Sequence, residues 1–152
     1  MEEPPRVLAA RPEQAAAVTG LLVRFFAEEG FAVPAATIGE RVAAFLTEPA
    51  NAVFLAWRGG RAVGVATVTT RFGIEYGLGG ELEDLYVLPG ARGAGVAGRL
   101  IDAAAGWCRS RGGTQLEVCV TPEGQRAHDL VGFYRRRGFA DQGRRLLNRP
   151  LG

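Results

Sequence analysis

The segment from residue 81 to residue 100 constrains the fold of this chain more than any other part of the sequence. Its first half, 81–88, is predicted to form a strand that carries carboxylates, and a short glycine-rich loop with one arginine follows. The residues after the loop begin an amphipathic helix. A strand that runs through such a loop into a helix presents free backbone N–H groups and a positive dipole end to an anion, usually a phosphate. The segment therefore predicts an anion site with carboxylates close to it.

Length and charge narrow the class of protein. The 152 residues predict a single domain over 1–152, and a formal charge of +2 is too small to indicate nucleic acid or a membrane surface as a partner. Cys108 and Cys119 have neither metal-ligand spacing nor the density of a disulfide scaffold, so we expect reduced thiols and no metal. The acidic N-terminus lacks an apolar signal region, and the apolar runs are too short to cross a bilayer. These features predict a cytoplasmic protein.

Strand and helix patterns alternate along the chain. Strands are expected at 6–10, 52–57, 62–70, 81–88 and 115–120, with a final strand from residue 139 that ends with 144–147. Helices are expected from Pro12 to Gly30, from a Thr37 cap to Pro49, from the glycine loop to about residue 111, and over 125–137. Residues 71–80 are expected to form a loop. The order β-α-α-β-β-β-α-β-α-β predicts a mixed α/β (α+β) domain with a central sheet.

The glycine loop admits more than one interpretation. Gly93 to Gly98 satisfies G-x-G-x-x-G, the dinucleotide fingerprint, and Glu117 follows at about the expected distance of ~20 residues. Against this, the strand ends near Leu88, four residues too early, and too little sequence follows for a doubly wound sheet. A phosphate-binding P-loop is excluded because the chain has no lysine. A plain tight turn needs fewer small residues than this loop contains.

At these residues the chain resembles the GNAT superfamily of acetyl-CoA-dependent N-acetyltransferases. The family's cofactor signature, Arg/Gln-x-x-Gly-x-Gly/Ala after Val-x-Pro, is matched by Val87-Leu88-Pro89 and then by residues 92–97. A second match is the helix that ends in Phe133-Tyr134 and continues to Gly138-Phe139. The resemblance implies a mixed, mostly antiparallel sheet flanked by helices. It also implies transfer of the acetyl group of acetyl-CoA to a primary amine by direct attack in a ternary complex.

The resemblance places coenzyme A along the opening segment. Backbone N–H groups of the loop would hold the pyrophosphate, and the pantetheine arm would lie like an added strand between the strand that ends near Val87 and the strand at 115–120. A backbone N–H there would polarise the thioester carbonyl. Arg137, beside Arg135 and Arg136, would meet the 3′-phosphate or else complement its own helix C-terminus. The residues implied for the cofactor are Leu85, Tyr86, Val87, Arg92, Gly93, Ala94, Gly95, Val96, Ala97 and Arg137.

Three residues are candidates for proton transfer. An alkylamine is mostly protonated at neutral pH, so a general base is useful. Leu82-Glu83-Asp84 is similar to a segment of diamine-type acetyltransferases in which the glutamate is the base, which makes Glu83 the first candidate and Asp84 the second. Strand alternation predicts Glu83 and Asp84 on opposite faces unless a bulge intervenes. By the same resemblance, Tyr134 would protonate the departing thiolate; spacing alone would make it a core aromatic.

The sequence says less about the amine that accepts the acetyl group and about the oligomeric state. Phe72, Glu75, Tyr76 and Asp84 are expected at the substrate site, and a small-molecule amine, for example a diamine or an aminoglycoside, is favoured over a protein. Ala127 replaces the family's usual asparagine, and His128 beside it is a candidate substitute. A homodimer is also considered. The alternatives are a catalytically silent acyl-CoA sensor of the same fold and an NAD(P)-binding oxidoreductase.

Overall fold

The computed structural model describes residues 3–152, and its centre is a sheet with the strand order β1-β2-β3-β4-β5. The first four strands, β1 (Arg6–Ala9), β2 (Asn51–Arg58), β3 (Arg61–Gly73) and β4 (Gly77–Val87), pair antiparallel. The short strand β5 (Leu116–Val118) adds to β4 in parallel. The predicted mixed α/β fold with a mostly antiparallel sheet is therefore confirmed.

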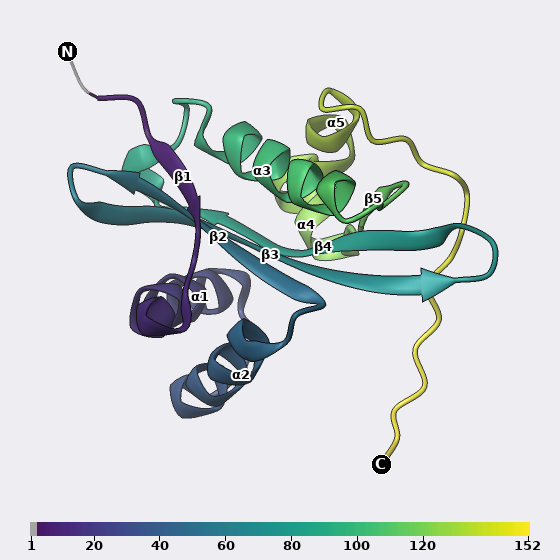
Figure 1. Ribbon diagram of the computed structural model, residues 1–152, viewed down its shortest axis with the longest axis horizontal. Helices are drawn as coiled ribbons and strands as arrows, with labels where there is room; N and C mark the ends of the chain where they lie inside the picture. The colour runs from purple at the N-terminus through teal and green to yellow at the C-terminus, as the bar shows by residue number, and fades with distance from the viewer. Residues whose placement is uncertain (1–2) are drawn as a thin grey trace. The chain divides into compact units, whose positions relative to one another are not determined.

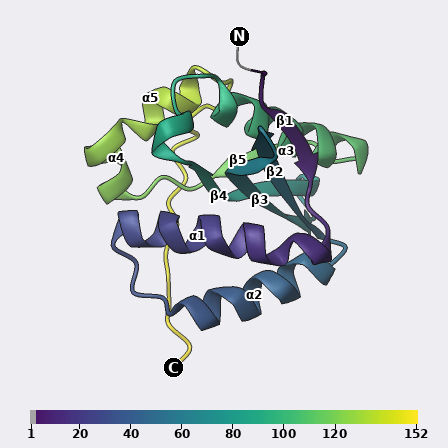
Figure 2. The same ribbon diagram turned by 90° about the vertical axis from the view of Figure 1, so that its left-hand side faces the viewer.

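Helices cover both faces of this sheet (Figure 1, Figure 2). A 3-10 turn (Pro12–Gln14) leads into α1 (Ala15–Glu29), and α2 (Ala35–Thr47) packs with it on one face. Helix α3 (Val96–Ser110) lies on the other face, after a 3-10 turn at Pro89–Ala91. These three helices supply buried core residues: Val18, Leu21, Leu22, Ile38, Val42, Leu100, Ile101, Ala104 and Cys108.

Small residues let α3 approach the sheet closely. A side chain at Gly64 of β3 would meet Leu100 and Val96 at 3.1 and 3.2 Å, and a side chain at Gly80 of β4 would collide with Cys108. Residues of β3 and β4 that share a face with these glycines therefore look toward α3. The residues that alternate with them, such as Val65 and Thr67 of β3, look toward α1 and α2.

The chain divides into two compact units, residues 1–119 and residues 120–152. The second unit contains α4 (Pro122–His128) and α5 (Leu130–Arg135). The single domain expected from length stays a prediction. Within residues 3–152, no helix is both long and apolar enough to cross a membrane.

Four local predictions were wrong. Residues 139–152 contain no strand: Gly143 adopts a left-handed φ of 74°, and no described strand pairs with 144–147. The loop expected at 71–80 is instead the end of a tight β3–β4 hairpin that turns at residues 74–76. The helix expected at 125–137 is broken at Asp129, whose φ is 46° and whose side chain caps α5. Thr37 lies inside α2, whose N-cap is Pro34.

Candidate active site

A β-bulge in β4 shapes the acid-bearing segment. Thr67 of β3 is paired with Asp84 and its neighbour Val68 with Leu82, so Glu83 is an extra residue in β4 without a partner in β3. An extra residue shifts the alternation of side chains by one position. The bulge therefore turns Glu83 and Asp84 toward the same face of the sheet, whereas uninterrupted alternation would have separated them.

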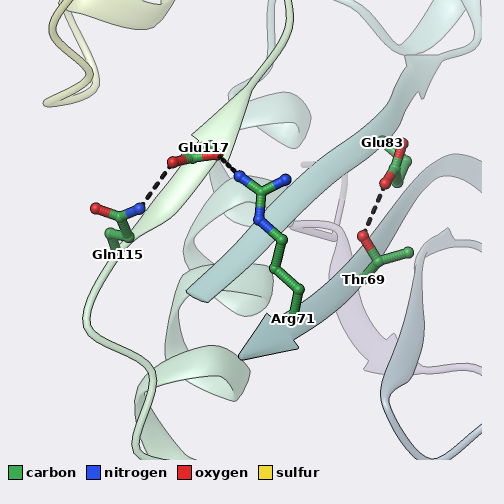
Figure 3. Close-up of polar contacts among 5 residues, drawn as sticks. All are labelled: Thr69, Arg71, Glu83, Gln115 and Glu117. Atoms are coloured by element: carbon green, nitrogen blue, oxygen red, sulfur yellow. Dashed lines mark hydrogen bonds and ion pairs between the residues drawn. The ribbon is translucent and has the colours of Figure 1, made fainter. Parts of the chain in front are cut away.

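Threonines of β3 hold both carboxylates on that face. The Thr67 hydroxyl donates a hydrogen bond to Asp84 Oδ2 at 2.5 Å, and the Thr69 hydroxyl donates to Glu83 Oε1 at 2.7 Å. Figure 3 shows the Thr69–Glu83 contact. Thr69 is paired with Glu81, which places Glu81 on the same face. The two threonines were not among the predicted site residues, because their role depends on the strand register.

The acidic face continues onto β5. Arg71 of β3 extends across β4 and donates to Glu117 Oε2 at 2.6 Å, while Gln115 donates to the other oxygen of Glu117 at 2.7 Å (Figure 3). Glu81 lies between Thr69 and Glu117 in the register. Partial burial, followed by the charge of Glu83, raises the pKa of Glu81. The face therefore carries more negative than positive charge, as a cationic ligand requires.

Unlike the exposed Glu83, Asp84 is partly buried. It lies at a cavity beneath α1 and α2 whose walls are largely apolar. Burial raises the pKa of Asp84, against the opposing effect of the Thr67 hydrogen bond. Its second oxygen, Oδ1, accepts no hydrogen bond from the residues that the structure describes.

Asp84→Asn is expected to stabilise the fold at neutral and alkaline pH, on the order of 1 kcal/mol. A pKa raised by folding means that the folded state binds the proton more tightly, so stability is lost as pH rises through the folded pKa. Asparagine keeps an oxygen for the Thr67 hydroxyl and removes the charge. Thermal unfolding of both proteins across pH should show a gain for the variant at pH 8 that disappears in acid. An equal melting-temperature difference at every pH would contradict this account of Asp84.

The pairing of β4 with β5 ends early. It covers only Gly80–Leu82 and Leu116–Val118, so residues 83–87 of β4 extend past the last paired position. Leu85, Tyr86 and Val87, which were predicted to meet the cofactor, all lie in this extension. The extension begins at the bulge, where Glu83 and Asp84 are located. An extended ligand that hydrogen-bonds to this edge would thus lie next to both carboxylates.

The glycine loop ends in an open helix N-terminus. Gly93 and Gly95 adopt left-handed φ angles of 80° and 76°, and Gly95 is the N-cap of α3. The first hydrogen bond into the helix runs from the Arg99 N–H to the Gly95 carbonyl at 3.2 Å. For the N–H groups at 95–98, no described residue supplies an acceptor. Together with the helix dipole, these groups form a cradle that fits a phosphate.

The Arg92 side chain braces this cradle. Its Nε donates to the Val87 carbonyl at 2.9 Å and its Nη2 to Glu28 Oε2 at 3.0 Å. The Tyr86 hydroxyl donates to the other oxygen of Glu28 at 2.5 Å, and these bonds lower the pKa of Glu28. Arg92 is among the residues predicted for the cofactor, and its guanidinium connects the end of β4 to α1. Glu28 was missed because only the fold brings α1 to this place.

The second unit contains two of the predicted residues, Tyr134 and Arg137. Tyr134 is buried, and its ring packs edge-on against Phe133 and Phe139 at centroid distances of 5.0 and 5.3 Å. Its hydroxyl has no hydrogen-bond partner among the described side chains and backbone. Burial raises the pKa of Tyr134 to about 12, so the phenol stays protonated. Arg137 stacks 3.7 Å above Phe133 and donates to its carbonyl, as a residue that complements a helix C-terminus does.

The remaining predicted substrate residues lie at the β3–β4 hairpin end. Phe72 is 77% exposed and Ile74 99% exposed, while Glu75 and Tyr76 form the turn. Asp84 lies on β4, about eight residues beyond Tyr76 along the chain, or roughly 26 Å at the rise of an extended chain. The structure therefore does not bring Phe72, Glu75 and Tyr76 together with Asp84. Within residues 3–152, no cluster of side chains is suited to a metal ion.

The sequence is similar to those of known proteins over most of its length. A sequence model of the acetyltransferase (GNAT) family matches residues 17–139. An uncharacterized N-acetyltransferase of Mycobacterium bovis, Mb2688, is 33% identical over 107 residues, and a Mycobacterium tuberculosis protein, Rv2669, matches to the same extent. The match covers 70% of this chain and 64% of the length of these relatives.

Solved structures share the whole fold. An integron cassette protein from the Cole Harbour salt marsh metagenome has 30% identity and a TM-score of 0.84, over 96% of this chain and 90% of its own. The aminoglycoside N-acetyltransferase AAC(6′)-Iy, solved in complex with CoA, has 21% identity and a TM-score of 0.85, over 100% of this chain and 97% of its own. The second likeness concerns the fold alone. The family match covers most of the sequence, and the chain belongs to the GNAT acetyltransferase family.

Proposed function

We propose that this protein transfers the acetyl group of acetyl-CoA to a primary amine of a small molecule. The observation that carries the proposal is the continuity of three features along one segment. Two carboxylates lie at the bulge, an unpaired strand edge follows at 83–87, and the open N-terminus of α3 comes next. A carboxylate base, an edge for an extended ligand and a phosphate cradle are what this transfer requires.

The cradle and the strand edge fit acetyl-CoA. The N–H groups at 95–98 would donate hydrogen bonds to the pyrophosphate, and the left-handed glycines Gly93 and Gly95 keep the approach to them open. The edge at 83–87 would hydrogen-bond to the pantetheine arm. When bound there, acetyl-CoA would supply the activated acetyl group. NAD(P) is the weaker candidate, because β4 ends at Val87, well before Gly93.

Glu83 is proposed to accept the proton of the attacking amine. It is exposed, hydrogen-bonded by Thr69 and located at the start of the unpaired edge. Its exposure gives it access to solvent, whereas the partly buried Asp84 is better suited to hold a cationic group. The abundance of carboxylates on this face supports a cationic acceptor, which favours a small-molecule amine. Aminoglycoside acetyltransferases among the structural neighbours lend the same support.

Tyr134 is proposed to donate a hydrogen bond to the departing sulfur. The Tyr134 phenol has a pKa of about 12, and an ordinary thiol such as that of cysteine has a pKa of about 8.5. Transfer of the phenol proton to a thiolate is therefore unfavourable by roughly 5 kcal/mol. Tyr134 is therefore proposed to act mainly by hydrogen bonding to the thiolate. The proton that converts the thiolate to the thiol comes from solvent or from the amine. The unpartnered hydroxyl of Tyr134 is available for that bond.

Tyr134→Phe is expected to lower kcat by about 10- to 100-fold and to leave the KM for acetyl-CoA within about twofold. The hydroxyl has no protein partner to lose, so the melting temperature should not change. Steady-state kinetics and a thermal melt check both points. A variant that keeps full kcat would remove Tyr134 from the reaction.

A thermal melt with each candidate cofactor tests the cofactor assignment. A ligand that binds the folded state raises its stability by RT ln(1 + [L]/Kd), about 2.7 kcal/mol at a hundredfold excess over Kd. Acetyl-CoA is expected to raise the melting temperature and NAD to leave it unchanged. Protection by NAD without protection by acetyl-CoA would support the oxidoreductase instead.

A further inference from the structure

A cavity of about 180 Å³ lies in the first unit between α1, α2 and the α1/α2-facing side of the sheet. Most of its wall is apolar and buried, from both helices and from β2: Val18, Leu22, Ile38, Val42 and Val53. Phe26, Val33 and Phe45 complete the apolar part of the wall. An apolar cavity of roughly 150 Å³ in another protein holds a benzene ring, so this one is large enough for a ring-sized group.

The sheet contributes two polar residues to this cavity, Thr67 and Asp84. Thr67 is buried, and its hydroxyl is already used on Asp84 Oδ2. Asp84 Oδ1 has no donor among residues 3–152, and it is open to solvent at the cavity rather than sealed inside it. A carboxylate beside apolar walls is costly unless a cation or a donor accompanies it. An ammonium group on a ligand would supply both the charge and the missing hydrogen bond.

The apolar walls of the cavity favour amines that carry a single charge. A polyamine or an aminoglycoside carries several charges, each of which would lose its hydration against Val18, Ile38 and Val42. Arg41, an exposed cation on the lining, would also repel a second ammonium group. An amine with one charge and an apolar body avoids both costs and gains from burial of its hydrocarbon surface.

We infer that this cavity is the acceptor site and takes a small primary amine carried on an apolar, ring-sized body, with its amino group at Asp84. The inference rests on the proposed acetyl transfer and names its substrate class. Asp84 immediately follows Glu83, the proposed base, and lies on the unpaired edge of β4. An amine held by Asp84 is therefore adjacent to both the base and the edge proposed for pantetheine.

Calorimetric binding of two matched probes tests the inference independently of turnover. Phenethylamine carries the ammonium group, and 2-phenylethanol has the same ring and chain length with a neutral hydroxyl. Asp84→Asn should weaken phenethylamine binding on the order of 30-fold and change 2-phenylethanol binding by less than about threefold. Asp102→Asn, an exposed residue of α3, is the matched control and should change neither. Undetectable phenethylamine binding, or equal binding to wild type and Asp84→Asn, would overturn the inference.

A cavity-filling variant tests whether the probes bind in the cavity or only at the exposed carboxylates. Val42→Phe places a ring in the cavity and should weaken both probes by about tenfold or more, with acetyl-CoA affinity unchanged. A melt and acetyl-CoA binding establish that the variant is folded; if it does not fold, the Asp84→Asn comparison decides alone. Acceptor assays then compare phenethylamine with spermidine and kanamycin. Efficient turnover of only the polycations would contradict the inference about the cavity but would still support acetyl transfer. If phenethylamine binds but no amine is acetylated, the proposed acetyl transfer is contradicted, whereas the amine-binding cavity is still supported.

Discussion

Gly95→Glu is expected to weaken acetyl-CoA binding by about 100-fold. Gly95 is the N-cap of α3 and adopts a φ of 76°, with its N–H group in the proposed phosphate cradle. A carboxylate placed there would face the pyrophosphate charge. Two unit charges roughly 6 Å apart in a medium of effective dielectric constant about 20 repel by about 2.8 kcal/mol, which corresponds to about 100-fold in Kd.

Gly112→Glu is the matched control, because Gly112 follows the other end of the same helix. It is exposed, has a φ of 86° and has open space around its α-carbon, as Gly95 does. Both variants carry the strain of a left-handed side-chain residue, about 1–2 kcal/mol. The helix dipole favours a carboxylate at the N-terminus and disfavours it at the C-terminus, so the control should be the less stable of the two. Calorimetric titration of acetyl-CoA should show the loss only for Gly95→Glu, and similar affinities for the two variants would contradict the cradle.

Glu83→Gln is expected to lower kcat/KM by about 10²- to 10⁴-fold at neutral pH, the range for loss of a general base. Glutamine keeps an oxygen for the Thr69 hydroxyl, so the bulge should persist. The defect should shrink as pH rises toward the pKa of the amine, because the free amine then needs no base. A pH profile of kcat/KM for both proteins measures this convergence.

Glu81→Gln is the control for Glu83→Gln, because it removes a charge two residues away on the same face of the sheet. It should cost less than about tenfold, through the weaker attraction for a cationic acceptor alone. Asp84→Asn should raise the KM for the amine more than it lowers kcat. If Asp84→Asn instead lost the pH-dependent rate and Glu83→Gln kept it, the two roles would be exchanged.

Much of the fold could be predicted because local patterns agree with it. The strands expected at 52–57 and 62–70 are β2 and β3, and the Gly59-Gly60 pair between them, with φ angles of 55° and 73°, is a sequence typical of the hairpin turn that joins them. The apolar stripe of the helix after the glycine loop is the buried face of α3. In each case, neighbouring residues specify the structure without help from distant ones.

The bulge was left open by the sequence interpretation, although a signal was present. Leu82 and Leu85 both look toward α3, paired with Val68 and Ala66, and they are three residues apart. Strict alternation cannot place residues three apart on one face, so two acids between two leucines of one face indicate an extra residue. The cavity, by contrast, has no local signal, because α1, α2 and three strands build it together.

The errors have similar causes. A strand was expected at 144–147 because of its apolar residues. Leu146 and Leu147 are both largely exposed, because no described strand lies beside them to pair with. Asp129 breaks the helix between α4 and α5 by capping the Gly132 N–H, which spacing of apolar residues does not reveal. The hairpin end at 71–80 was expected to be a loop because of its glycines, and β3 and β4 pair through most of it.

Amine-dependent release of the coenzyme A thiol from acetyl-CoA tests the central claim most directly. It should be followed together with the masses of the amine and of the protein, across apolar monoamines, polyamines, aminoglycosides, amino acids and peptides. The account predicts thiol release only when an amine is present, matched by acetylated amine, with the protein mass unchanged because the transfer is direct. Tight acetyl-CoA binding without thiol release for any amine class would contradict it and identify the protein as a silent acyl-CoA sensor.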